Sequence, residues 1–223
     1  RRFMSALRSA ARIKPIILLK AGRHETDSPA GSTCVADAVF DAAMRRAGVV
    51  RVQHIGQLFF AAKALAAGFR PREAPLTIVT NGGGPGAMAA DRAGDLGIPL
   101  AVLSDDSLAR LGRLIVGERR PGNPLDLGGD ASPERYRDTL RLLADDPAVD
   151  NVLVMLSPHA MTDPLEVARA LIDLAADSRL RLCACWMGGG QVAEGRQLLE
   201  QAGVPVFRSP ETAIELFHNI SRF

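Results

Sequence analysis

The chain has 223 residues, of which 47% are hydrophobic and 23% are charged, and its formal net charge is +2. These values are typical of a soluble protein with one large or two small domains. They exclude a membrane protein, because no apolar run approaches the length of a membrane span, and they disfavour nucleic-acid binding, because the arginines are dispersed. We therefore expect a cytoplasmic protein with no membrane and no nucleic-acid partner.

The first third of the chain alternates helical and strand-like segments. It begins with Arg1 rather than methionine, inside an expected helix, so we interpret it as a piece of a longer protein. The second expected helix has Val39, Phe40 and Ala43 facing inward. In order, we expect a helix up to residue 14, a strand over 15–19, a polar loop over 24–32, a helix over 36–46, a strand over 49–52, a helix over 55–66 and a linker over 69–75.

From residue 76 onward, strands and helices alternate without a break. Repeated βα units of this length predict a doubly wound parallel sheet with helices on both faces. The expected strands cover residues 76–80, 99–103, 151–156, 180–186 and 204–207, and the expected helices lie near 85–95, 133–144, 163–176, 191–202 and 210–221.

A glycine-rich turn after the strand at 76–80 is the most informative feature of the sequence. Glycine lets a ligand approach the backbone closely, and Pro85 suits the first turn of a helix. The free N–H groups at such a helix start favour a phosphate, and the candidate residues are Asn81, Gly82, Gly83, Gly84 and Gly86. The alternative is a plain strand-to-helix turn, since the spacing matches neither a Walker A loop nor a dinucleotide fingerprint.

Two further turns follow predicted strands at the same edge of the sheet. They contribute His159, Gly188 and Gly189 as possible ligand-edge residues. The segment 123–130 predicts an ordered loop in which Asp126 and Asp130 act as charge partners or as turn caps.

Other common catalytic and metal-binding patterns are absent from the sequence. It has no Ser/His/Asp arrangement, HExxH motif or CxxC motif, and Cys34, Cys183 and Cys185 lack metal-ligand spacing. We predict reduced thiols and no metal site.

Five motifs in this order resemble the NDP-forming acyl-CoA synthetases, which are related to succinyl-CoA synthetase. The resemblance implies flavodoxin-like domains: residues 1–73 as the C-terminal half of a first domain and residues 74–223 as a complete second one. A CoA-binding Rossmann domain and an ATP-grasp domain would lie outside this sequence. The motifs are residues 14–23 (KPIILLKAGR), 41–49 (DAAMRRAGV), 79–86 (VTNGGGPG), 122–127 (GNPLDL) and 160–164 (AMTDP).

The resemblance also implies a reaction. In that family, acyl-CoA and phosphate give an acyl phosphate, whose phosphoryl group passes through a histidine to a nucleoside diphosphate. That histidine is held between the N-termini of two helices, one of which matches the turn at 81–86. Acetyl-CoA or CoA, and ATP or ADP with magnesium, are thus implied for the parent protein, and none of them for the fragment itself.

The sequence departs from the family at the histidine. The family's Ser-His-Thr-Gly corresponds to residues 28–31, which place Pro29 at the phosphohistidine position, and proline has no nucleophilic nitrogen. The segment over 23–28 is also several residues shorter than is usual in that family. His24 is a weak substitute that nothing in the sequence positions, and we therefore assign no catalytic residue.

In lacking this histidine, the sequence resembles the Pat-type bacterial protein lysine acetyltransferases, which join a ligase-dead synthetase region to a GNAT domain. Residues 185–188, 202–205 and 208–211 also resemble that group. Our first hypothesis is thus a non-catalytic, acyl-CoA-responsive region of a GNAT-type acetyltransferase. The alternatives are an active ADP-forming acyl-CoA synthetase and a non-enzymatic interaction domain. The expected partners are the parent's own CoA-binding, ATP-grasp and GNAT domains, and a homo-oligomer is possible.

Overall fold

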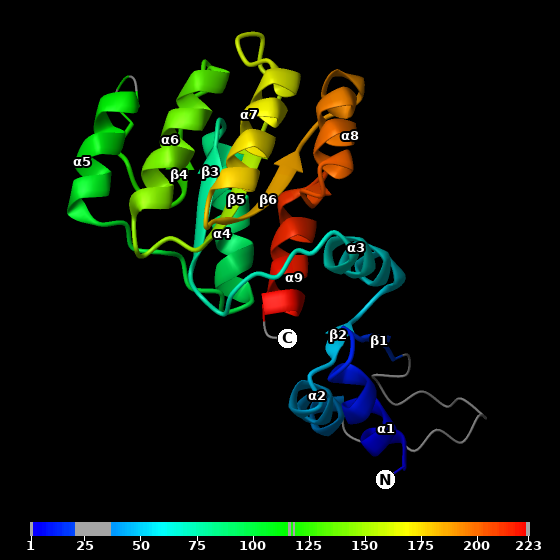
Figure 1. The fold of residues 1–223 in the computed structure, drawn as a ribbon. Coiled ribbons are helices and arrows are strands. Elements are labelled where there is room, and N and C mark those ends of the chain that lie inside the picture. Colours follow the sequence, from blue (N-terminus) through cyan, green and yellow to red (C-terminus); the bar gives the residue numbers. More distant parts are fainter. Residues whose placement is uncertain (1, 21–36, 116, 118, 222–223) are drawn as a thin grey trace.

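The computed structural model describes residues 2–20, 37–115, 117 and 119–221, and its fold is drawn in Figure 1. Its N-terminal region contains α1 (Arg2–Ala11), β1 (Ile17–Leu19), α2 (Asp37–Arg46), β2 (Val50–Val52) and α3 (Ile55–Ala66). Strands β1 and β2 pair in parallel. These elements confirm the pattern expected from the sequence, with ends that differ by a few residues.

One side chain of α2 was assigned to the wrong face. Phe40 and Ala43 pack inward as expected, together with Met44, but Val39 is 60% exposed. The inward-facing stripe consists of residues 40, 43, 44 and 47. Val39 is turned about 100° around the helix axis from Phe40.

The larger region is a five-stranded, fully parallel sheet in the order β4-β3-β5-β6-β7. Numbered from β3, this is the flavodoxin-like order 2-1-3-4-5, as the sequence predicts. The strands are β3 (Leu76–Thr80), β4 (Leu125–Asp126), β5 (Asn151–Leu156), β6 (Arg181–Trp186) and β7 (Val206–Phe207).

Helices cover both faces of this sheet (Figure 1). One face packs against α5 (Asp105–Leu114), α6 (Pro133–Asp145), α7 (Pro164–Asp177) and α8 (Ala193–Gln201), which follows the short 3₁₀ turn η1 (Gly190–Val192). The other face packs against α4 (Gly83–Asp95), α9 (Pro210–Ser221) and α3. None of the described helices is long and apolar enough to cross a membrane.

The strand position beside β3 is filled by two separate pieces of chain. Leu100 forms an isolated parallel bridge with Leu76, and β4 pairs with β3 only at its last two residues. Between them, the Asn123 side chain takes the place of a peptide group: its Oδ1 accepts from Ile78 N at 3.0 Å and its Nδ2 donates to Leu76 O at 2.8 Å. The expected strand over 99–103 is therefore wrong, because an inserted helix divides this strand position in two.

That inserted helix, α5, was not expected. Its start carries ordinary signals: Ser104 Oγ accepts from Ser107 N at 3.2 Å, and Asp105 and Asp106 occupy the first turn. The helix spans only 10 residues and follows a strand-like apolar segment, and the sequence pattern of that segment predicts a strand followed by a loop.

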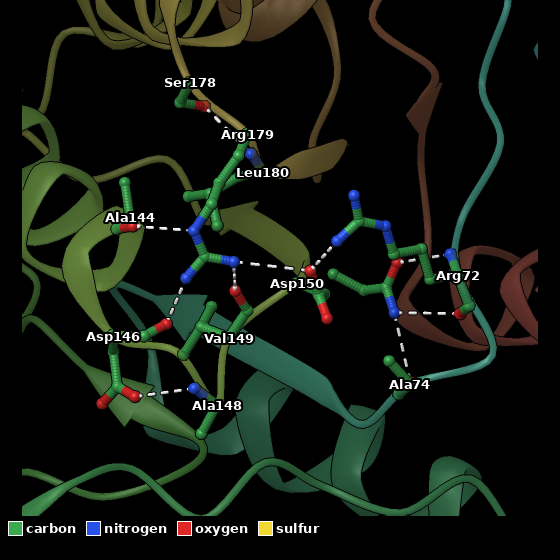
Figure 2. Close-up of polar contacts among 11 residues, drawn as sticks. Arg72, Ala74, Ala144, Asp146, Ala148, Val149, Asp150, Ser178, Arg179 and Leu180 are labelled. Atoms are coloured by element: carbon green, nitrogen blue, oxygen red, sulfur yellow. Dashed lines mark hydrogen bonds and ion pairs between the residues drawn. The ribbon is translucent and has the colours of Figure 1, made fainter.

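Figure 2 shows how the linker into the sheet is fixed at the amino ends of the strands. Asn151 Oδ1 accepts from Arg72 N at 3.0 Å, and its Nδ2 donates to Arg72 O and Ala74 O, both at 3.1 Å. Asp150 pairs with both Arg72 and Arg179. The linker is thus held by specific bonds to the first residue of β5, on the edge opposite the expected ligand site.

The N-terminal region contacts the sheet domain through α3 and α9. Gln57, which is 7% exposed, donates from Nε2 to Glu215 Oε2 at 2.8 Å, and Arg92 Nη2 donates to Glu215 Oε1 at 2.7 Å. Glu215, on α9, therefore joins one residue of α3 and one residue of α4. Burial raises the pKa of Glu215, but the bonds from Gln57 and Arg92 outweigh it and hold that pKa below its usual value.

Candidate functional site

The candidate site lies where β3 and β5, which are neighbours in the sheet, end at its carboxyl edge. In a sheet of order 2-1-3-4-5, the chain leaves the first strand in one direction and the third in the other, which opens a crevice between them. The loops that follow these two strands contain residues 81–82 and 157–163. The topology therefore brings the glycine-rich turn beside the loop of His159.

Helix α4 starts immediately above β3, two residues earlier than the sequence indicated. Its N-cap is Gly82, which makes no side-chain capping bond, and Gly83 and Gly84 are exposed. Pro85 follows within the first turn and has no N–H to offer. The backbone N–H groups of the first two helical residues are thus uncapped by a side chain at the positive end of a 13-residue helix.

The glycines of this turn have different roles. A Cβ on Gly86 would lie 2.9 Å from Thr80 Cγ2, so this glycine allows α4 to pack closely on its own strand. A Cβ on Gly82 would lie 3.1 Å from Ser157 Oγ, and one on Gly83 would lie 3.2 Å from Asp126 Oδ2. Gly84 faces open space. Gly82 and Gly83 therefore mark the place where neighbouring polar groups approach the start of α4.

Asn81 connects the two loops through its buried side chain. Its Oδ1 accepts from Ser157 N at 2.7 Å and its Nδ2 donates to Ser157 O at 2.8 Å, as a neighbouring strand would. Thr162, also buried, donates to Ala131 O at 3.0 Å. The buried Asn81 amide therefore fixes the spacing of the two loops.

Ser157 holds an unused polar atom at this site. Its Oγ is buried and makes no hydrogen bond to any described residue. Buried hydroxyls are normally paired, so an orphan beside an uncapped helix start is a group available to a ligand or to an ordered water.

The loop after β4 borders the same helix start. Asp126 Oδ1 accepts from Gly128 N at 2.9 Å, and its Oδ2 lies 3.6 Å from Arg119 Nε. Asp130 pairs with Arg135 at 3.0 Å, and the side-chain bond from Arg135 holds the pKa of Asp130 below its usual value. Both aspartates are thus charge partners, and Asp126 is in addition a turn cap.

The remaining predicted edge residues lie on the neighbouring loops. The His159 ring lies against Gly129, with Nδ1 3.1 Å from the position of a Cβ there. Gly188 has a φ of 113° and packs on Pro158. Beneath this turn, the buried Arg196 donates to Gly188 O at 2.8 Å and to Gly189 O at 3.1 Å.

Sequence reasoning missed two residues of this edge, Arg196 and Arg119, whereas Ser157 begins one of the two further turns expected there. Nothing in the sequence marked Arg196, because its role depends on which loops become neighbours. Arg119 lies next to the motif at 122–127, which gave it no separate signal. Pro29 and His24 lie outside the described residues, and the described residues contain no group of three or more potential metal ligands.

Two family profiles match the sequence. The profile described as a succinyl-CoA ligase like flavodoxin domain matches residues 1–65, and the one described as a ligase-CoA domain matches residues 76–212, which is more than half of the chain. The flavodoxin-like fold in the first description agrees with the sheet order described above.

Similar proteins of known function come from archaea. The chain is 35% identical over its whole length to an ADP-forming acetate–CoA ligase I of Archaeoglobus fulgidus and covers 32% of that protein. It is 33% identical, over 96% of its length, to the alpha subunit of the ADP-forming acetate–CoA ligase I of Pyrococcus furiosus, of which it covers 48%. The chain thus spans between a third and a half of these relatives.

A solved structure shows the same fold. It is an acetyl-coenzyme A synthetase 1 of Ca. Korarchaeum cryptofilum in complex with phosphate and ADP. The TM-score is 0.85 and the identity 26%, and the match covers 99% of this chain and 49% of the other.

These relatives overturn the first functional hypothesis. The expectation of a ligase-dead region of a GNAT-type acetyltransferase is wrong, because the relatives that match along the whole chain are ADP-forming ligases. The absence of histidine concerns the single position 29, whereas the five motifs of the family extend over residues 14–164. The chain belongs to the family of NDP-forming, succinyl-CoA ligase-like acyl-CoA synthetases.

Proposed function

We propose that this chain is part of an ADP-forming acyl-CoA ligase, in which it supplies a phosphate-binding site at the start of α4. In the reaction, acyl-CoA and phosphate give acyl phosphate and CoA. The phosphoryl group then moves to a histidine with release of the acid, and from the histidine to ADP to form ATP. Acetyl-CoA is the acyl donor that the relatives' names support.

The observation that carries this proposal is the uncapped start of α4 at the β3–β5 crevice. The N–H groups of Gly83 and Gly84 suit the oxygens of a phosphate, and the helix dipole favours its charge. The unpaired Ser157 Oγ, 3.1 Å from the position of a Cβ on Gly82, offers a third group. The related structure that matches this chain was solved with phosphate and ADP bound, which is consistent with such a site.

The phosphoryl carrier is assigned to His24. Pro29 has no nucleophilic nitrogen, whereas His24 lies five residues earlier in the sequence. A neutral imidazole nitrogen can accept the phosphoryl group from an acyl phosphate and pass it to ADP.

Further domains complete the enzyme. In the complete enzyme, a Rossmann domain would bind CoA and an ATP-grasp domain would bind ADP with magnesium. Both domains would lie outside this sequence. The relative from Pyrococcus furiosus is an alpha subunit, which supports this division of labour between chains or domains.

The test is ATP formation by the full-length protein from acetyl-CoA, ADP, magnesium and phosphate. We expect ATP and CoA to appear in equal amounts and only when phosphate is present. No ATP from acetyl-CoA or from other short acyl-CoAs would refute the ligase reaction.

The carrier is tested separately with His24→Asn and ³²P-phosphate. In the presence of acetyl-CoA, the unsubstituted protein should gain an acid-labile phosphoryl group within residues 21–36, and His24→Asn should not. ATP formation that persists in His24→Asn would reject His24 and leave the ligase assignment intact.

A further inference from the structure

An internal carboxylate already lies at the proposed phosphate site. Asp126 Oδ2 is 3.2 Å from the position of a Cβ on Gly83, the first residue of α4, and 3.6 Å from Arg119 Nε. One oxygen is therefore close both to the positive end of a helix and to a guanidinium.

The position of Asp126 is fixed from two sides. Its Oδ1 accepts from Gly128 N, which forms a two-residue side-chain turn, and Leu125 beside it is fully buried in the core. Arg119 lies over Gly128, with Cζ and Nη1 each 3.0 Å from the place of a Cβ, so only glycine leaves room for this guanidinium. A Cβ there would also be strained, because φ is 88°.

These neighbours are those that a bound phosphate would need. Uncapped helix N–H groups and an arginine are the common ligands of phosphate oxygens in proteins. Asp126 is an anion that already lies beside this helix start and 3.6 Å from Arg119 Nε, so it occupies the same positive surroundings when no phosphate is bound. Two anions at this distance repel each other, and both cannot use the same N–H groups and guanidinium.

We propose that Asp126 is a competing internal anion: a phosphate or phosphoryl group binds at α4 by displacing its carboxylate, and Arg119 then pairs with the phosphate. This inference rests on the phosphate site of the proposed function. It adds Asp126 and Arg119 as the pair that determines how selectively that site binds phosphate. Asp126 sets how tightly phosphate is held, and Arg119 is the cation that both anions share.

The test measures the dissociation constant of inorganic phosphate by equilibrium dialysis with ³²P-phosphate, using the full-length protein at fixed ionic strength. Asp126→Asn removes the charge and keeps an acceptor for Gly128 N, so phosphate should bind about tenfold more tightly or better. Arg119→Gln should weaken binding by a similar factor.

The matched control is Asp130→Asn. It removes the same charge from the same loop, but Asp130 pairs chiefly with Arg135, interacts with Arg119 only as its weakest charge partner, and is not the carboxylate next to Gly83. We expect a change within about threefold, since an exposed and more distant charge is largely screened.

The outcomes separate this inference from the proposed function. Unchanged or weaker binding in Asp126→Asn, with binding by the unsubstituted protein, would overturn the competition and leave the phosphate site in place. No binding by any variant would overturn both. If Asp126→Asn unfolds at a lower temperature, Asp126→Ser, whose hydroxyl can still accept from Gly128 N, takes its place in the same comparison.

Discussion

At the scale of single residues, the glycines of α4 show how one sequence motif serves separate purposes. Gly83 leaves the helix start open beside Asp126, whereas Gly86 lies against Thr80 and allows α4 to pack on β3. Both positions matched the phosphate motif in the sequence, because a linear pattern shows that glycine is present and not which neighbour requires it.

Gly86→Ala is expected to lower the free energy of unfolding by about 1–3 kcal/mol, because its Cβ would press on Thr80. Gly94→Ala, in the same helix with nothing within 4 Å, should instead raise it by up to about 1 kcal/mol. Denaturant unfolding measures both. Equal effects of the two substitutions would show that packing on β3 does not explain Gly86.

Asp146 gives a prediction about pH. Burial raises its pKa, but bonds from Ser104 N at 2.9 Å and Ala148 N at 2.9 Å outweigh this and hold the pKa below the unfolded value of 3.8. Its stabilising contribution is therefore present above pH 3.8 and is lost as the pH falls through the lower, folded-state pKa.

Asp146→Asn should therefore destabilise the protein at pH 7 by about 1–3 kcal/mol, because an amide offers only one of the two acceptors. It should also flatten the fall of unfolding free energy in acid. Chemical unfolding at a series of pH values tests this, and an unchanged acid slope would contradict the assignment.

At the scale of elements, regular strands and long amphipathic helices were predictable from the sequence. The strands over 76–80 and 151–156 were predicted at their observed ends, since each is a short buried run bounded by turn signals. The split strand position beside β3 was not predictable. There, a side-chain amide from Asn123 replaces backbone pairing, and this depends on a contact between residues more than 40 positions apart.

The turn between β6 and α8 depends on Arg196. Its guanidinium donates to Trp186 O, Gly188 O and Gly189 O, so Arg196→Met would leave three carbonyls without this donor. We expect a loss of about 2–4 kcal/mol in unfolding free energy, with partial rescue in Arg196→Lys. A loss under about 0.5 kcal/mol would indicate that water replaces the guanidinium without cost.

At the scale of the whole molecule, Glu215 joins the N-terminal region to the sheet domain. Glu215→Ala would leave the buried Gln57 amide without its carboxylate and should weaken this contact by about 1–3 kcal/mol. Hydrogen exchange should then become faster in α3 and remain unchanged in β5. Glu211→Ala, on the same helix, is the control, and similar exchange in both variants would contradict the role of Glu215.

Family membership was also predictable at this scale, because five motifs extend along nearly the whole chain. The branch within the family was not, since the first hypothesis depended on the missing histidine at residues 28–31 and on short C-terminal similarities at 185–188, 202–205 and 208–211. The boundary near residue 73 remains a prediction. The candidate residues lie at the carboxyl edge of the sheet, where the sequence placed them, and their binding of phosphate remains a prediction. The pairing of Asp126 with Arg119 depended on a loop arrangement that periodicity does not reveal.

The most direct test of the central claim is the KM for phosphate in ATP formation by the full-length protein, compared between Gly83→Ala and Gly94→Ala. A Cβ on Gly83 would intrude at the start of α4, where the phosphate is proposed to bind. We therefore predict that the KM for phosphate rises by about tenfold, which corresponds to about 1.4 kcal/mol of binding free energy. Gly94→Ala should leave the KM unchanged. ATP formation with the same KM in both variants would show that phosphate binds elsewhere.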